Sequence, residues 1–311
     1  MERGISVDYD LIVAGAGPAG LTSGIYAARS GLKALVFEKG VAGGQTILTD
    51  WVENYPGFPE GLPGRELADR FVQQLSKVGI EITYAGVEEI KPLGKGFKVT
   101  AGQKEYFTKA VILAMGTQAK KIGAPGEAKF TGRGVSYCAV CDAPFFRNKK
   151  VAVVGGGDTA VEEALYLTKF AGEVHLIHRR DQLRAVSILR DRALSNEKIV
   201  MRWNTVVEEI KGDQLIETLV LKDTVTGETV EEAFNGVFVF IGTAPKTGCI
   251  GFEISKNEKG YIITDEWLAT SRPGVFAAGD IREKFLRQVS TAVGDGALAT
   301  MSAEKYLMEK Y

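Results

Sequence analysis

The sequence predicts an α/β protein with two Rossmann-like dinucleotide-binding domains, the second inserted in the first. Three observations support this prediction: a strand–glycine turn–helix–strand unit near the N-terminus, a second copy mid-chain, and a return to short apolar strands and a helix in the last third. At 311 residues the chain exceeds the usual single-domain length. Its 45% hydrophobic and 25% charged residues are typical of globular proteins.

The first unit begins with the apolar run Tyr9–Ala14, interpreted as a strand. The turn Gly15–Gly20, a helical pattern over Leu21–Ser30 and a second strand that ends at Glu38 follow. In a Gly-x-Gly-x-x-Gly turn, the first glycine permits the bend, the second lets phosphate approach, and the third allows close helix packing. The helix start then offers N–H groups to pyrophosphate and Glu38 accepts hydrogen bonds from ribose. A glycine turn that serves folding alone is the alternative.

The second unit repeats this order with the strand Lys150–Val154, the turn Gly155–Ala160 and a helix through Lys169. Its next strand, Glu173–Ile177, is followed by His178, 18 residues after the turn, the same spacing as for Glu38 in the first copy. The repeated spacing indicates two nucleotide sites rather than one.

A basic cluster stands where the first unit has Glu38. It consists of His178, Arg179, Arg180 and, one helical turn on, Arg184. A carboxylate there would repel a 2′-phosphate, whereas guanidinium groups pair with it. The second nucleotide is therefore predicted to be NADPH rather than NADH. The alternative is a solvated positive face at a helix start.

The remaining segments are expected to complete the domains. Predicted strands cover Phe97–Thr100, Ala110–Thr117, Gly236–Thr243 and Val275–Asp280, and an amphipathic helix runs from about Gly294 to Glu309. Glycine- and proline-rich joints lie near residues 116–126 and 242–248. The first domain is therefore predicted to comprise residues 1–117 with 246–311, and the inserted second domain residues 118–245.

Three cysteines occur, and Cys138 and Cys141 form a Cys-x-x-Cys motif. This spacing suggests redox or metal chemistry. A structural zinc site needs about two more ligands, and only Cys249, His175 and His178 remain, so no metal site is expected. A pair of packed, reduced thiols stays an alternative. Cys249 has no neighbouring partner or base and is interpreted as a bystander.

Charge and hydropathy exclude several classes of partner. With 38 basic and 39 acidic side chains, the net charge of −1 gives no field for capturing nucleic acid. No apolar run approaches the ~20 residues of a spanning helix, and the first ten residues do not resemble a signal peptide. We expect a cytoplasmic protein without nucleic-acid or membrane partners.

Several motifs stand together in one order along the chain. They are Gly15–Gly20, Gly43-Gly44-Gln45, Cys138–Asp142, Gly155–Ala160, His178–Arg180 and Gly279-Asp280. In this order the chain resembles the low-molecular-weight thioredoxin reductases over nearly its whole length. The resemblance implies an NADPH-dependent thioredoxin-disulfide reductase with FAD, a homodimer, and thioredoxin or a glutaredoxin-like dithiol protein as its partner.

The resemblance also implies the residues that contact the cofactors. For FAD they are Gly15, Ala16, Gly17, Pro18, Ala19, Glu38, Lys39, Gly44, Gln45, Asn54, Gly116, Asp280, Arg287, Gln288 and Val289. For NADPH they are Gly155, Gly157, Asp158, Thr159, Ala160, His178, Arg179, Arg180 and Arg184. Gln45 and Asn54 could equally be ordinary loop caps.

The same resemblance gives each catalytic residue a role. Cys141 would face the flavin, Cys138 would attack the substrate disulfide, and Asp142 would move the proton that the leaving thiolate requires. Asp142 could also be a helix cap. Phe145, Phe146 and Arg133 would form a docking surface, unless the phenylalanines pack in the core.

Two other functions remain open from the sequence. One is a flavin-dependent ferredoxin:NADP reductase or dithiol oxidase, and the other is a non-catalytic protein that senses nucleotides.

Overall fold

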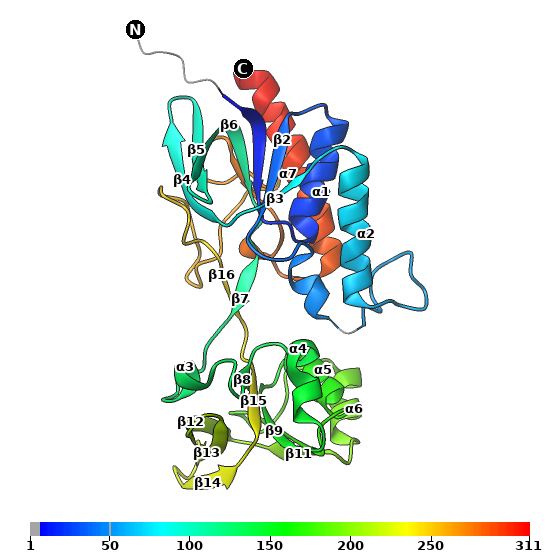
Figure 1. Ribbon diagram of the computed structural model, residues 1–311, viewed down its shortest axis with the longest axis vertical. Coiled ribbons are helices and arrows are strands. Elements are labelled where there is room, and N and C mark those ends of the chain that lie inside the picture. Colours follow the sequence, from blue (N-terminus) through cyan, green and yellow to red (C-terminus); the bar gives the residue numbers. More distant parts are fainter. Residues whose placement is uncertain (1–6, 50) are drawn as a thin grey trace. The chain divides into compact units, whose positions relative to one another are not determined.

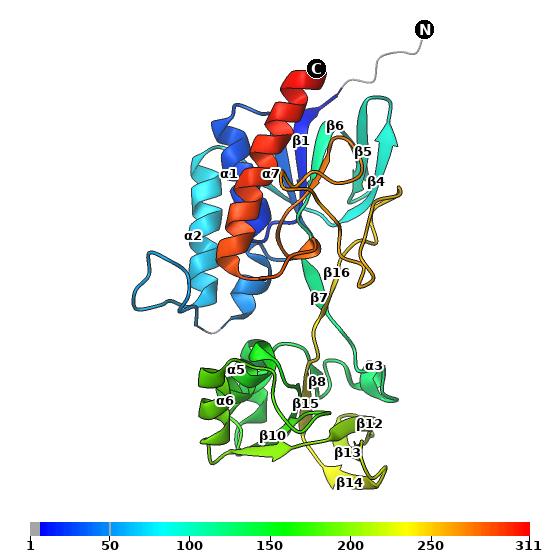
Figure 2. The same ribbon diagram turned by 180° about the vertical axis from the view of Figure 1, so that it is seen from behind.

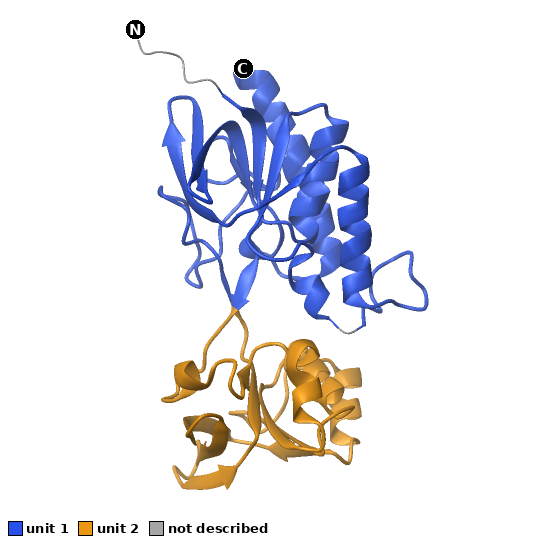
Figure 3. Cartoon of the chain, in the orientation of Figure 1, with its two compact units in different colours: residues 1–118, 244–311 blue, residues 119–243 orange. Residues whose placement is uncertain are grey.

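The computed structural model describes residues 7–49 and 51–311 and divides the chain into two compact units. Unit 1 comprises residues 1–118 and 244–311, and unit 2 comprises residues 119–243 (Figure 3). Unit 2 is thus inserted in unit 1. The first boundary lies one residue after the predicted one, and the second lies two residues before it.

A seven-stranded sheet forms the centre of unit 1, in the order β3-β2-β1-β6-β5-β4 with β17 also paired to β6. The strands are β1 (Tyr9–Ala14), β2 (Ala34–Glu38), β3 (Ile82–Tyr84), β4 (Val87–Leu93), β5 (Gly96–Ala101), β6 (Lys104–Leu113) and β17 (Val275–Ala277). Strand β5 pairs antiparallel with both of its neighbours, β4 and β6, and the other pairings are parallel. Leu11 and Val13 of β1 pack beneath the helices, whereas Ile12 and Ala14 pack in the core on the opposite face.

Three long helices lie together on one side of this sheet (Figures 1 and 2). They are α1 (Pro18–Arg29), α2 (Gly64–Lys77) and α7 (Val289–Lys310). The short turns η1 (Gly44–Leu48) and η3 (Gly279–Ile281) precede α2 and α7 in the chain. Helix α7 begins at Val289, so the predicted start near Gly294 was wrong. A capping box between Gln288 and Thr291 starts the helix earlier. A Cβ atom at Gly296 would lie 2.2 Å from the Ala19 carbonyl oxygen, so this glycine allows close packing of α7 on α1.

Unit 2 contains a five-stranded parallel sheet in the order β11-β10-β9-β15-β8. Its strands are β8 (Val135–Ser136), β9 (Lys150–Gly155), β10 (Glu173–Ile177), β11 (Ile199–Arg202) and β15 (Gly236–Phe240). Figure 1 shows α4 (Ala139–Asp142), α5 (Asp158–Leu167) and α6 (Ser187–Leu194) on one side. Val151 and Val153 of β9 pack in the helix-side core, and Ala152 and Val154 pack in the core on the other face. The two units therefore share one construction.

An antiparallel three-stranded sheet covers the other face of unit 2. It consists of β12 (Thr205–Gly212), β13 (Ile216–Asp223) and β14 (Thr229–Ala233). The short helix α3 (Glu127–Phe130) and the turn η2 (Ala143–Phe146) complete the unit. Strands β12 and β13 supply Val207 and Leu219 to the core of this face. The sequence did not predict this small sheet.

Three predicted strands are shorter at their carboxyl ends than expected. Strand β6 stops at Leu113, β15 stops at Phe240 and β17 stops at Ala277. A glycine with positive φ follows each of them: Gly116 at +63°, Gly242 at +109° and Gly279 at +76°. Strand geometry does not accommodate positive φ, so each chain segment turns away from its sheet at the edge where ligands bind in such folds.

The two segments that join the units pair with each other. Strands β7 (Thr117–Ala119) and β16 (Thr243–Pro245) form a two-stranded sheet. The Lys120 N–H donates to the Gly242 carbonyl oxygen at 2.9 Å, and the Lys246 N–H donates to that of Gly116 at 3.0 Å. This register makes the pair antiparallel. Among the described residues, no helix is long and apolar enough to cross a membrane.

Candidate functional site

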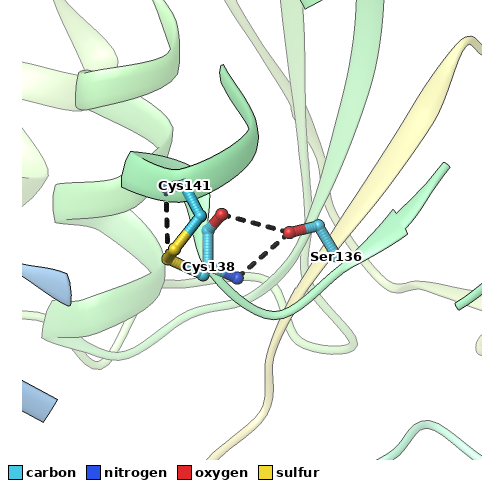
Figure 4. Close-up of a disulfide and its surroundings, with 3 residues drawn as sticks. All are labelled: Ser136, Cys138 and Cys141. Carbon is cyan, nitrogen blue, oxygen red and sulfur yellow. Dashed lines mark hydrogen bonds between the residues drawn. A yellow bond between two sulfur atoms is a disulfide. The ribbon is translucent and has the colours of Figure 1, made fainter. Parts of the chain in front are cut away.

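Cys138 and Cys141 form a disulfide at the start of helix α4, with their Cα atoms 5.4 Å apart (Figure 4). Cys138 is the N-cap residue, and its Sγ accepts a hydrogen bond from the Cys141 N–H at 3.2 Å. The Ser136 hydroxyl accepts from the Cys138 N–H and donates to the Cys138 carbonyl oxygen, both at 3.1 Å. The Cys138 sulfur therefore lies against a backbone N–H, which favours the thiolate when the pair is reduced.

The surroundings of the pair combine exposed and buried groups. Cys141 is exposed, whereas Cys138 and Asp142, the last residue of α4, are half-buried. Phe146 is buried and packs edge-on against Phe238 with ring centroids 5.2 Å apart, while Phe145 is 72% exposed. Phe146 is thus a core residue, whereas Phe145 and Arg133 are exposed and available to a partner.

The buried carboxylate of Glu127, which the sequence did not single out, supports the segment before the cysteines. Its oxygens accept hydrogen bonds from the N–H groups of Ile122 at 2.9 Å and Gly123 at 2.8 Å. They also accept from the Tyr137 hydroxyl at 2.7 Å. Burial and the Glu127 charge raise the pKa of Tyr137 to about 12. Because Tyr137 directly precedes Cys138, its bond to Glu127 holds in place the chain segment that leads into the disulfide.

The first glycine turn has the geometry that a nucleotide site requires. Gly15 has a φ of +104°, and a Cβ atom there would lie 2.5 Å from the Ala114 carbonyl oxygen. A Cβ atom at Gly20 would lie 1.7 Å from the Gly15 carbonyl oxygen. At Gly17 the nearest atom is the Gly44 Cα at 3.8 Å. The turn is therefore closed at its ends and open at its middle glycine, where a phosphate would approach.

The Glu38 carboxylate ends β2 beside this turn. It accepts hydrogen bonds from the N–H groups of Ala16 at 3.0 Å and Gly40 at 2.9 Å. The stem of the neighbouring Lys39 packs against Gly86. The structure thus brings Glu38 and Ala16 together, although they are far apart in sequence.

Two predicted amide side chains connect distant segments of unit 1. Gln45 Nε2 donates to the Thr117 hydroxyl at 2.8 Å, next to Gly116. Asn54 Nδ2 donates to Gln288 Oε1 at 3.2 Å, at the start of α7. Both amides tie together loops that carry other predicted FAD contacts.

Asp280 and Arg287 each bury a polar atom without a partner. Within residues 7–49 and 51–311, Asp280 Oδ1 and Arg287 Nε make no hydrogen bond. Burial raises the pKa of the Asp280 carboxyl, against the opposing charges of Lys284 and Arg287. The Arg287 guanidinium lies 4.1 Å from the centroid of the Tyr261 ring. Since buried polar groups are nearly always paired, this acceptor and this donor fit a polar ligand such as a flavin nucleotide.

The second glycine turn repeats the geometry of the first. A Cβ atom at Gly155 would lie 2.4 Å from the Phe240 carbonyl oxygen and 2.6 Å from the Ala160 Cβ. No atom lies within 4 Å of a Cβ atom at Gly157. Asp158, the first residue of α5, accepts a hydrogen bond from the Val186 N–H at 2.8 Å. The middle position of this turn is again open.

His178 lies against this turn at the end of β10. Its ring would be 2.3 Å from a Cβ atom at Gly156, and its Nε2 is buried without a partner among the described residues. Burial lowers the pKa of His178, as do the neighbouring arginines. Several of the other predicted NADPH contacts are exposed, among them Thr159, Arg179, Arg180 and Arg184. The site thus offers cations and no carboxylate at the position of Glu38, which fits a phosphorylated ribose.

Comparison with known proteins identifies the family. Residues 9–296 match the pyridine nucleotide-disulphide oxidoreductases. The thioredoxin reductase of Bacillus subtilis is 50% identical over 303 residues, which cover 97% of this chain and 95% of that protein. The crystal structure of Lactococcus lactis thioredoxin reductase in the FR conformation is 46% identical, covers 97% and 100% of the two chains and has a TM-score of 0.94.

A ferredoxin-flavin thioredoxin reductase from Clostridium acetobutylicum is more distant. It is 33% identical, with a TM-score of 0.54 and coverage of 97% and 99%. The nearer matches extend over both units and include both glycine turns. The chain therefore belongs to the pyridine nucleotide-disulphide oxidoreductases and, within them, to the thioredoxin reductase family.

Proposed function

We propose that the chain is an NADPH-dependent thioredoxin-disulfide reductase that uses FAD and the Cys138–Cys141 pair. Its substrate is oxidised thioredoxin or a related small dithiol protein, including the glutaredoxin-like ones. The observation that carries the proposal is the closed Cys138–Cys141 disulfide, in a chain with two nucleotide-type glycine turns.

Unit 1 is proposed to hold FAD. At Gly17 a Cβ atom would meet only the Gly44 Cα, at 3.8 Å, so phosphate has room to approach the N–H groups at the start of α1, which bind the FAD pyrophosphate. Asp280 and Arg287 contact polar groups of FAD through their unpaired atoms. The bound flavin supplies the chemistry that links a hydride donor to a disulfide. The predicted boundaries, residues 1–117 with 246–311 for FAD and 118–245 for NADPH, remain part of this proposal.

Unit 2 is proposed to bind NADPH and to carry the exchange chemistry. Arg179, Arg180 and Arg184 pair with the 2′-phosphate, which NADH lacks. In the reduced pair, the Cys138 thiolate is stabilised by the Cys141 N–H and attacks the substrate disulfide. A bond forms between Cys138 and one substrate sulfur, and the other substrate sulfur leaves as a thiolate and takes a proton, which Asp142 supplies.

Cys141 then completes the exchange. Its thiolate attacks Cys138 Sγ, closes the intramolecular disulfide and releases the second substrate sulfur as a thiolate. Two substrate sulfurs are reduced and two enzyme sulfurs are oxidised, so the electrons balance. Cys141 is the sulfur that we assign to the flavin side.

Substitution of Cys138 tests the proposal. Cys138→Ser should abolish NADPH-dependent reduction of thioredoxin while NADPH oxidation by an artificial acceptor continues. Cys249→Ser is the matched control, because Cys249 is half-buried, burial raises the pKa of its thiol, and both activities should persist. Thioredoxin reduction that survives in Cys138→Ser would refute the assignment.

The electron donor needs its own test, because one relative is named a ferredoxin-flavin enzyme. NADPH should bleach the flavin absorbance and a protein disulfide should restore it, whereas a nucleotide sensor would show binding without this cycle. Reduction by ferredoxin but not by NADPH would contradict the proposal. We further propose a cytoplasmic homodimer, which light scattering of the purified protein and fractionation of cells would test.

A further inference from the structure

Asp295 is a buried carboxylate of α7 that gathers donors from a different segment. It accepts hydrogen bonds from the Gly279 N–H at 3.0 Å and from Lys284 Nζ at 2.8 Å. Arg282 donates to both carboxylate oxygens, from Nε at 2.8 Å and from Nη2 at 2.9 Å. Asp295 is 8% exposed and the Lys284 side chain 6% exposed. Burial opposes the charge of Asp295, but Arg282 and Lys284 hold its pKa below the ordinary value.

Asp280 lies on the same turn as Gly279, and the bonds of Asp295 determine which cations are free to pair with it. Lys284 and Arg287 are the cations close enough to lower the pKa of Asp280. The Lys284 ammonium, however, pairs with Asp295, and the Arg287 guanidinium lies over Tyr261 and donates to the Arg282 carbonyl oxygen at 3.3 Å. Asp280 Oδ1 is consequently left buried without a hydrogen bond in the described part of the chain.

Asp295 also fixes where Asp280 lies relative to the first glycine turn. A Cβ atom at Gly279 would lie 3.0 Å from the Ala19 Cβ, and one at Gly296, the neighbour of Asp295, would lie 2.2 Å from the Ala19 oxygen. Ala19 belongs to the first turn of α1, beside the proposed pyrophosphate position. The hydrogen bond from Gly279 to Asp295 therefore fastens the Asp280 turn to the two helices that frame the site.

We propose that Asp295 is a positioning residue for flavin binding, because it holds Lys284 away from Asp280 and leaves the Asp280 carboxylate to accept a hydrogen bond from an FAD hydroxyl. This inference rests on the proposed function. Arg282 is not the competing cation, since it keeps two other acceptors, the Thr264 hydroxyl at 3.4 Å and the Glu283 carbonyl oxygen at 3.1 Å. Lys284 has no other hydrogen bond within the described residues.

The test compares four variants of the full chain after removal of bound flavin. The dissociation constant for added FAD is measured by flavin fluorescence, and the melting temperature of the flavin-free protein is measured alongside it. Asp295→Asn keeps an oxygen at the Oδ2 position, which accepts from the Gly279 N–H and from Lys284 Nζ, but it removes the negative charge that holds the Lys284 ammonium. Lys284 is then drawn to the carboxylate of Asp280. We expect it to weaken FAD binding about tenfold, the effect of losing one charge-assisted hydrogen bond.

The double variant Asp295→Asn with Lys284→Gln removes the competing cation and should bind FAD within about threefold of the unmodified chain. Lys284→Gln alone should bind FAD normally. Asp10→Asn is the matched control, since it breaks a 2.7 Å ion pair with Lys109 in the same unit without touching this cluster. If Asp295→Asn does not fold, the double variant still tests the idea, because no unpaired buried ammonium remains in it.

Normal FAD binding by Asp295→Asn would overturn the inference, and so would a double variant that binds as weakly as Asp295→Asn. The second result would mean that Asp295 acts only through packing, which loss of the competing Lys284 charge cannot rescue. If the unmodified chain does not bind FAD, the proposed function itself fails, and this outcome is distinct from the other two.

Discussion

Glu127→Gln is expected to destabilise unit 2 strongly, because the Glu127 carboxylate is 3% exposed and accepts three hydrogen bonds. A glutamine amide can keep its oxygen toward Ile122 and Tyr137, but its NH₂ group then meets the Gly123 N–H. The lost bond to a charged acceptor contributes about 1.5–3 kcal/mol, and the two remaining bonds each weaken by about 0.5 kcal/mol. The expected loss in free energy of unfolding is therefore about 2.5–4 kcal/mol.

Urea denaturation followed by tryptophan fluorescence measures this loss. Trp203 is the tryptophan of unit 2, while Trp51 and Trp267 are about half exposed in unit 1 and can be replaced by phenylalanine. In that background Trp203 reports on the transition of unit 2 alone. With a denaturant dependence of about 2 kcal/mol per M, the midpoint should fall by about 1.3–2 M.

A control and a pH titration sharpen the test. Tyr137→Phe removes one of the three bonds and should cost about 1 kcal/mol. Loss of the Glu127 charge should also lower the pKa of Tyr137 from about 12 toward 10.0, as read from phenolate absorbance. The pKa of Tyr137 is higher in the folded than in the unfolded protein. The contribution of the protonated Tyr137 to stability is therefore present below pH 10.0 and is lost as pH rises through about 12. A Glu127→Gln midpoint within about 0.3 M of its parent would refute the reasoning.

Three further outcomes are expected. Arg179→Ala should raise the Michaelis constant for NADPH about tenfold and leave that for NADH unchanged, and equal effects would mean that the basic cluster was misinterpreted. Gly156→Ala should displace the His178 ring and weaken NADPH binding, whereas Gly157→Ala should keep the stability of unit 2 and lose only NADPH binding. Calorimetric titration measures the binding of NADPH and thermal melting measures the stability of each variant. Burial lowers the pKa of His175 in the folded protein, so the contribution of the neutral ring to stability is present above pH 6.5 and is lost as pH falls through the folded pKa. His175→Gln should flatten the pH dependence of the melting temperature.

Features governed by neighbouring residues could be predicted from the sequence. Strands β1 and β10 have the predicted bounds, because an apolar run between polar residues and a glycine turn defines both ends. The steric role of Gly20 also follows from local geometry, since a Cβ atom there would meet the Gly15 carbonyl oxygen of the same turn.

Features governed by distant contacts could not be predicted. Gly294 and Gly296 looked like a helix boundary, yet α7 runs through both, because the small residue at Gly296 meets Ala19 of a helix at the other end of the chain. Asp295 had no visible role, since its partners lie on a separate loop. Glu127 belongs to no motif singled out in the sequence, and only the fold shows that its carboxylate is buried.

The pairing of β7 with β16 has a consequence for how the chain folds. Because Lys120 bonds to Gly242 and Lys246 to Gly116, the two ends of the inserted segment are neighbours. Once unit 2 has folded, the long insertion therefore constrains unit 1 in the same way as a tight hairpin turn would. Closing a long flexible loop costs entropy that grows as the logarithm of the loop length. Here the folding of unit 2 already brings the two ends of the insertion together, so unit 1 does not bear this cost. A deletion that replaces residues 119–243 with a short turn should therefore leave unit 1 able to fold by itself.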